Sequence, residues 1–236
     1  MIARWIALAV LQVGLAVAAN AAELAPELRA LIEGFQAHRR TADAYLRTQN
    51  IELAAIEIER LRERWAADRA RLPALPADAA LAEALAETET AVARSLAAAD
   101  AGDVARARDL LERAAVPLDA WRRSNGVRLF SDCIGEVSQA HAALDRFREN
   151  PPDLSDPGTA APIAAATAAV LSALSRCDRE AAPALRQEGE FRRLIDGMSE
   201  SVRQIPQAIA ARDHARLHRL LIEQRSFERL LVFRYG

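Results

Sequence analysis

The chain has 236 residues, and 51% of them are hydrophobic, which is enough for one large or two small cores. Alanine, leucine, arginine and glutamate dominate while glycine is sparse, and this composition favours helices over strands. The formal net charge of −2 excludes a general nucleic-acid-binding protein, whose surface would be strongly basic.

The N-terminus has the order of an export signal. Arg4 supplies a positive charge, residues 5–17 form a run that is apolar except for Gln12, and residues 19–21 (Ala-Asn-Ala) fit a cleavage site of small residues. The apolar run is short for a membrane span, which takes about 20 residues. We therefore expect a signal peptide over 1–21 and a soluble exported protein, periplasmic in a Gram-negative host, with no transmembrane segment after cleavage.

Two amphipathic helices are expected first. Residues 26–40 place apolar side chains at the i, i+3, i+4 and i+7 positions of one face: Leu28, Leu31, Ile32 and Phe35. Residues 50–72 place apolar side chains near one stripe, opposite rows of glutamate and arginine: Leu53, Ile56, Leu61 and Trp65. Both patterns predict helices that turn one side toward a core.

Two more helices follow a proline-containing break at 72–78. Asp78, the last residue of the break, favours a helix N-cap. Helices are expected over 84–100 and 103–123, with an Ala-Gly turn between them. The Asn-Gly pair at 125–126 is typical of a helix C-terminus.

The remaining residues predict four helices. The first two, 127–147 and 161–182, flank a proline-rich break at 149–158. The last two are 183–212 and 213–233, and Pro206 favours a kink in the longer one.

The chain has two cysteines, Cys133 and Cys177. Cys133 does not begin a haem-attachment motif, because Glu136 and Val137 stand where a cysteine and a histidine would be needed. If the two helices fold back at residue 155, both cysteines lie about 24 Å from the loop and therefore level with each other. We expect a disulfide in an oxidising compartment, with two separate buried thiols as the alternative.

A weak internal repeat divides the chain. A shift of 110 positions aligns 103–111 with 213–221. We therefore expect an all-α fold of eight helices in four antiparallel hairpins, packed as two four-helix-bundle-like halves, 22–126 and 127–236. A solenoid like the tetratricopeptide repeats is the alternative, although the turns do not follow the 34-residue period of that family.

Residues 91–123 resemble the last two helices of the periplasmic four-helix-bundle cytochromes, the b-type and c-prime group. The third helix there ends at a glycine turn, and the fourth is alanine-rich with an aromatic residue near its end. Residues 48–70 are similar to the second helix of that bundle. The resemblance implies a fold, but it does not carry over the haem ligands. The b-type proteins use an early methionine and a late histidine, whereas the first half here has no methionine after Met1 and has Arg122 near the late position.

His214 and His218 form the one histidine pair at metal-binding spacing, i and i+4 on a predicted helix. A site normally needs a third protein ligand, for which His38, His141 or a neighbouring glutamate would be available. Met198 with one of the paired histidines is a haem alternative. The other interpretation is that both imidazoles lie along the helix flank without metal.

No catalytic constellation is apparent in the sequence. It contains no nucleophile elbow and no phosphate-binding glycine loop, and its acidic residues alternate with arginine at ion-pair spacing. All its basic residues apart from histidine are arginine, which we interpret as codon bias, with phosphate or carboxylate recognition as the alternative. We expect a non-enzymatic periplasmic binding or accessory protein without a cofactor, whose partner is a protein or a small molecule. A metal or haem carrier is the alternative.

Overall fold

The computed structural model describes residues 24–72 and 78–236. Within these ranges the protein is all-α, which confirms the fold class, and it has nine helices rather than the expected eight. The expected signal peptide, residues 1–21, lies outside the described residues.

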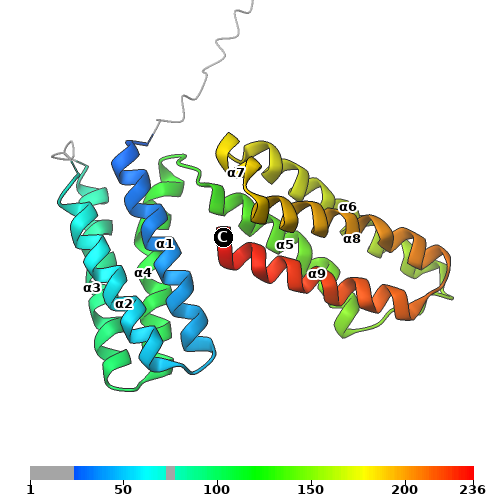
Figure 1. Cartoon of the computed structure of the whole chain (residues 1–236), viewed down its shortest axis with the longest axis horizontal. Coiled ribbons are helices and arrows are strands. Elements are labelled where there is room, and N and C mark those ends of the chain that lie inside the picture. Colours follow the sequence, from blue (N-terminus) through cyan, green and yellow to red (C-terminus); the bar gives the residue numbers. More distant parts are fainter. Residues whose placement is uncertain (1–23, 73–77) are drawn as a thin grey trace, which may run out of the picture.

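The first half consists of four helices that contact one another in a ring (Figure 1). They are α1 (Pro26–Arg47), α2 (Ile51–Arg69), α3 (Ala79–Asp100) and α4 (Val104–Ser124). Helix α1 contacts α2 and α4, and α3 contacts the same two helices. Because α1 and α4 meet, this half closes on itself and has the arrangement of an up-and-down bundle.

The second half repeats this arrangement and adds one short helix. Its long helices are α5 (Phe130–Glu149), α6 (Pro157–Glu180), α8 (Gly189–Ala210) and α9 (His214–Tyr235). The contact between α5 and α9 closes the ring. In a solenoid the fourth helix would not return to the first, so these contacts disagree with the solenoid alternative.

The ninth helix arises where one helix was expected over 183–212. The chain forms α7 (Pro183–Gln187), then Glu188 adopts an extended backbone with φ −67° and ψ 124°, and α8 begins at Gly189. Helix α8 continues through Pro206 to its end at Ala210. The break separates a five-residue turn of helix from the long α8 that packs in the core.

Helix boundaries follow local capping chemistry. The side chain of the residue before each of five described helices accepts a hydrogen bond from a backbone N–H in the first turn, as N-caps do: Asn50, Asp78, Asp103, Asp156 and Asp213. Gly102 and Gly126 have φ values of +77° and +66° where the chain leaves α3 and α4. Glycine adopts this left-handed conformation without steric cost, so it ends both helices.

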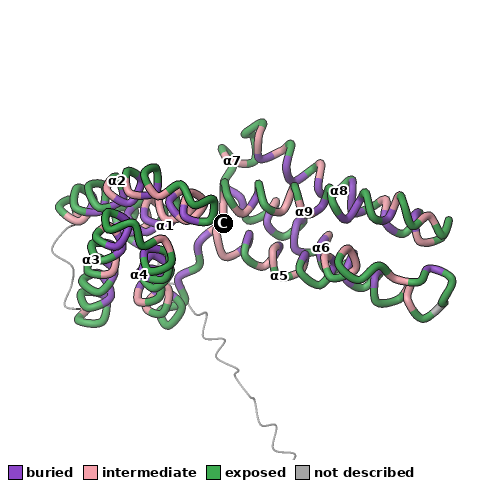
Figure 2. Tube along the Cα trace, turned by 90° about the horizontal axis from the view of Figure 1, so that it is seen from below, coloured by how far each residue is buried: buried purple, intermediate pink, exposed green. Residues whose placement is uncertain are grey.

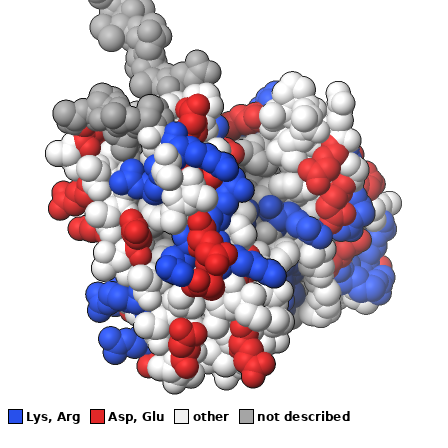
Figure 3. All heavy atoms as spheres, turned by 60° about the vertical axis from the view of Figure 1, so that its left-hand side comes forward, with Lys and Arg blue, Asp and Glu red and all other residues white. Residues whose placement is uncertain are grey.

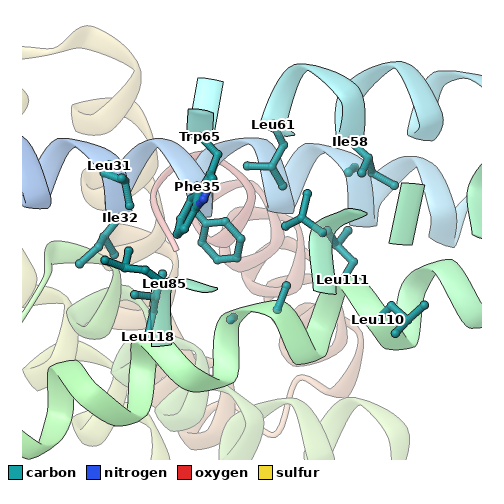
Figure 4. Packing of buried hydrophobic residues seen from close by; sticks show 14 of the residues in the cluster. Leu31, Ile32, Phe35, Ile58, Leu61, Trp65, Leu85, Leu110, Leu111 and Leu118 are labelled. Carbon is teal, nitrogen blue, oxygen red and sulfur yellow. The ribbon is translucent and has the colours of Figure 1, made fainter. Parts of the chain in front are cut away.

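The described residues form two hydrophobic cores, and Val127 and Leu129, which precede α5, pack with the first core (Figure 2). In the first, Phe35 of α1 and Trp65 of α2 meet edge to face, with ring centroids 5.7 Å apart (Figure 4). In the second, Phe191 of α8 meets Tyr235 of α9 at 5.4 Å. Aromatic pairs at these distances add to the stabilisation that comes from buried area.

The predicted apolar stripe of α2 is wrong in its first two turns. Leu61 and Trp65 are buried as expected, but Leu53 and Ile56 are exposed. The buried positions near the start of α2 are Ala54 and Ile58 instead. Because the side chain of Ala54 is small, a neighbouring helix can pack closely against it. The buried face of α2 therefore includes Ala54 and excludes the larger Leu53 and Ile56.

Cys133 of α5 and Cys177 of α6 form the expected disulfide. Their Cα atoms are 5.4 Å apart, and both residues are fully buried in the second core. The two helices pack side by side, so the folding back of the chain at residues 150–156 brings the two cysteines level.

Helix α6 bears on the expectation that no transmembrane segment remains after cleavage. Its segment Gly158–Glu180 is long and apolar enough to cross a membrane, by length and composition alone. In the folded chain α6 packs against α5 and α8, and its buried residues include Ile163, Val170 and Leu174.

Candidate functional site

A cleft of about 680 Å³ lies between the two halves. One wall is the second part of α1, and the other is formed by the last turns of α9 together with Ser138 of α5. Six charged side chains line it: Arg39, Arg40, Arg47, Arg229, Asp43 and Glu228. Arginine therefore outnumbers acidic residues two to one in the lining.

Helical spacing explains why these residues share the cleft. Arg40, Asp43 and Arg47 of α1 follow one another at i, i+3 and i+7, and Arg229 and Phe233 of α9 are separated by four positions. Residues at such spacings lie on one face of a helix. The two faces meet because α1 contacts α9.

Arg40 connects the two walls. Its Nε donates to the carbonyl oxygen of Phe233 at 3.3 Å, its Nη2 donates to that of Arg234 at 3.3 Å, and its Nη1 donates to the backbone oxygen of Gly236. The last carbonyl groups of a helix lack partners within the helix, and Arg40 satisfies several of them at the end of α9. Burial, with a smaller contribution from the charge of Arg39, lowers the pKa of Arg40 to about 10.

Both carboxylates of the cleft are already engaged. Asp43 accepts a hydrogen bond from Arg108 Nε at 2.9 Å, and its other oxygen lies 3.2 Å from Arg47 Nε. Glu228 accepts a hydrogen bond of 2.6 Å from the Ser138 hydroxyl. Asp43 is thus shared between two arginines, and the four arginines of the lining still outnumber its two carboxylates.

Arg39 and Arg229 remain without an acidic partner. Within the described ranges, neither guanidinium lies within 4.0 Å of a carboxylate, and Arg39 donates only to the amide oxygen of Gln36, at 2.9 Å. Burial lowers the pKa of Arg39, and the nearest acidic charges, Asp119 first, offset part of this effect. Figure 3 shows arginine side chains on both sides of the hollow between the halves. The cleft can thus accept negative charge.

Arg122 holds the two halves in position. At the end of α4 it forms a two-pronged ion pair with Asp132 of α5, whose Nη2–Oδ1 distance is 2.8 Å, and it also donates to the carbonyl oxygen of Val127 at 3.1 Å. Burial alone would lower the pKa of Arg122, but the hydrogen bonds and charges of Asp132 and Asp119 outweigh it and raise that pKa. These contacts fix the connection at residues 125–129 and hence the positions of the cleft walls.

The structure places the predicted histidine pair away from this cleft. His214 and His218 are exposed in the first two turns of α9. In the part of the chain that is described, no cluster of three metal-ligating side chains occurs. His38 instead lies in the first half, 2.6 Å from Glu57, and His141 is buried in the second half. The third ligand that the metal prediction requires is not brought to the pair.

The haem alternative also lacks a common site. Met198 is fully buried in the second core, whereas both paired histidines face the solvent. The metal and haem predictions can be tested by metal analysis and a visible spectrum of the purified protein. A stoichiometric metal or a Soret band, lost when both histidines are changed to alanine, would support them.

The sequence did not single out the arginines of the cleft. Arg39 and Arg40 are adjacent on an expected helix, and Arg122 precedes the expected connection between the halves. For Arg122, the signal that could have indicated a role between the halves is a long basic side chain close to their predicted boundary. The carbonyl groups bound by Arg40 and the Asp132 carboxylate bound by Arg122 could not be predicted, because they lie on the other half of the chain.

No protein-family model matches this chain, and neither a curated protein nor a solved structure matches it. The resemblance to the bundle cytochromes therefore stays a prediction based on sequence pattern.

Proposed function

We propose that this protein is an exported, non-enzymatic helical binding or accessory protein that holds a carboxylate- or phosphate-bearing ligand in the cleft between its halves. The observation that carries the proposal is the presence of Arg39 and Arg229 in this cleft without an acidic partner, within the described residues. Guanidinium groups bind carboxylates and phosphates through paired hydrogen bonds.

The electrostatics of the cleft support this proposal. Arg39 and Arg40 are partly buried, and burial lowers the pKa of each because the charged form loses hydration. An anion bound beside them would restore favourable interactions with the positive charge. Since Asp43 and Glu228 are held by other residues, they would not have to move to admit such a ligand.

Export is supported by two separate features. The first 21 residues have the charge, apolar and small-residue order of a signal peptide. The buried disulfide between Cys133 and Cys177 is typical of proteins that fold in an oxidising compartment. Fractionation of host cells and sequencing of the mature N-terminus test this part, and the expected first residue is Ala22. A cytoplasmic protein that keeps residues 1–21 would contradict it.

Calorimetric titration with citrate and with inorganic phosphate tests the ligand class. We expect at least one of them to bind at low ionic strength and to bind more weakly as salt rises, since ionic screening weakens exposed charge interactions. Arg39→Gln should weaken binding about tenfold, the loss expected for one charge-assisted contact. Arg39 is preferred to Arg40 because Arg40 also holds the end of α9.

Arg94→Gln is the matched control. Arg94 is exposed on α3, away from both cleft walls, so its replacement should leave anion binding unchanged. The proposal fails if neither anion binds, or if both variants bind as the unmodified protein does.

A further inference from the structure

The outward face of α9 carries an unpartnered apolar and basic stripe. Ile222, Ser226, Arg229 and Phe233 are spaced at i, i+4, i+7 and i+11, which places them on one side of the helix. Ile222 is 48% exposed and Phe233 is 39% exposed. The α9 stripe, as we call these four residues, is therefore accessible to solvent along three turns.

The α9 stripe is continuous with the cleft. Arg229 and Phe233 belong both to the stripe and to the cleft lining. Ile222 lies nearer the N-terminal end of α9 and is not among the lining residues. The stripe covers eleven residue steps, or about 16 Å of helix. In Figure 1, α9 runs from the junction of the halves toward the far end of the second half. A ligand that fills the cleft could thus extend along α9.

The charge along this face is positive. Arg219 flanks the stripe, and neither Arg219 nor Arg229 lies within 4.0 Å of a carboxylate in the described part of the chain. The acidic residues on the neighbouring sides of α9 keep their charge but contact other helices: Glu223 accepts a hydrogen bond from Ser201 of α8 at 2.6 Å, and Glu228 accepts one from Ser138 of α5 at 2.6 Å. A complementary partner must therefore be both apolar and acidic.

We propose that the cleft and the α9 stripe together dock an acidic amphipathic helix of a partner protein. The spacing of the stripe is that of one helix seam, which a second helix matches with apolar side chains at the same intervals. Acidic residues beside its apolar face would meet Arg229 and Arg219, and those near one end would enter the cleft beside Arg39. This inference rests on the proposed function, because the carboxylates in the cleft are those of the docked helix.

The shape of the surface favours a helix over a membrane. The wall formed by α1 stands beside Arg229 and Phe233, so these side chains line a concave site. A helix about 10 Å across can enter such a site, whereas a flat bilayer surface would meet the rim first. Anionic lipid binding is nevertheless a distinct outcome of the test.

Fluorescence anisotropy with the full protein tests the inference. The probe is a labelled peptide of about 18 residues, about 27 Å long as a helix, with leucine at i, i+4, i+7 and i+11 and with glutamate and glutamine elsewhere. A peptide of the same composition with its leucines distributed around the helix is the control probe. We expect the first peptide to bind at least about tenfold more tightly than the second.

Two matched pairs of variants locate the binding surface. Ile222→Ser and Arg229→Glu should each weaken binding of the amphipathic peptide about tenfold, as loss of a central contact does. Ile56→Ser and Arg94→Glu should leave it unchanged, because Ile56 is similarly exposed at 50% but lies on α2, and Arg94 lies on α3. Circular dichroism confirms that each variant is folded.

The possible outcomes separate this inference from the proposed function. If citrate or phosphate binds in an Arg39-dependent manner while the amphipathic peptide does not bind, the proposed function stands and the inference is wrong. The inference is also wrong if vesicles of phosphatidylglycerol bind the stripe while the peptide does not. Dimerisation of the protein that is lost in Ile222→Ser would overturn it too, since a second copy would then cover the stripe. If neither anion nor peptide binds, both proposals fail.

Discussion

His141 is a buried titratable side chain of the second half. It is 4% exposed at the interface of α5 and α9, and its Nε2 has no hydrogen-bond partner in the described structure. Burial lowers its pKa because the imidazolium loses hydration. The negative charges of Glu228 and Asp145 partly offset this effect, and the positive charges of Arg225 and Arg148 add to it. His141 is thus expected to be neutral in the folded protein at neutral pH.

This burial predicts an acid-sensitive second half. Because the folded-state pKa of His141 is below the ordinary value of 6.5, the unfolded chain binds more protons between the two pKa values. The free energy of unfolding should therefore fall as pH drops below about 6.5, by at most about 1.4 kcal/mol per pH unit for this one proton.

His141→Leu removes the titrating group and should flatten the pH dependence of stability in this range. Guanidinium denaturation at pH values of about 7.5, 6.5 and 5.5 measures it, since these values bracket the ordinary pKa of histidine. Parallel curves for the variant and the unmodified protein would show that His141 does not contribute.

Roles that depend on partners within one helix or one helical hairpin were predictable, as for Cys133 and Cys177, and roles that depend on how the two halves meet were not. Asp78 was identified as a helix N-cap because its partner, the N–H of Leu81, is three residues away. Arg40 was not identified because the carbonyl groups that it binds are 193 to 196 residues away. Sequence spacing within one helix carries no information about contacts of the second kind.

At the scale of elements, two helix glycines have opposite surroundings. A Cβ atom at Gly197 of α8 would lie 2.7 Å from Cζ of Phe227 on α9, whereas nothing lies within 4 Å of such an atom at Gly135 of α5. Gly197 therefore permits the close approach of α8 and α9 at this point, and Gly135 has no such role.

Substitution by alanine should separate the two positions. Gly135→Ala should stabilise the protein by about 0.5–1 kcal/mol through the higher helix propensity of alanine. Gly197→Ala should destabilise it by about 1–3 kcal/mol, because the Phe227 ring must move or the helices must separate. Denaturant titration of both variants measures the difference, and equal stabilisation by the two would show that the ring shifts without cost.

The register of α2 shows why an apolar pattern did not determine the buried face. Leu53 and Ile56 fit the expected stripe, yet the burial of Ala54 and Ile58 places them outside the core. Alanine counts weakly in an apolar pattern, but its size allows two helices to approach closely. In a chain this rich in alanine, the face with the largest residues and the face that packs most closely can differ by a fraction of a turn.

At the scale of the whole molecule, the sequence predicted two halves but not the site between them. The alignment of 103–111 with 213–221 and the level cysteines both depend on the internal order of each half. The cleft depends on how the halves meet, through Arg122 with Asp132 and through Arg40 with the end of α9. No periodic pattern specifies such a contact.

The separate cores predict that the halves unfold separately. The disulfide crosslinks only the second half, where it closes a loop of 44 residues, and the chain-entropy relation gives about 4 kcal/mol of stabilisation for a loop of that length. The double variant Cys133→Ala/Cys177→Ala should therefore destabilise the second half and leave the first unaffected.

Two spectroscopic signals can distinguish the halves. Trp65 and Trp121, the tryptophans of the described residues, both lie in the first half, whereas far-ultraviolet circular dichroism reports the helices of both. In guanidinium, the double variant should keep the midpoint of its tryptophan fluorescence transition, while part of its circular dichroism transition moves about 1 M lower. An equal shift of both signals would show that contacts such as the Arg122–Asp132 ion pair make the protein unfold as one cooperative unit, and the cleft would then be part of that unit.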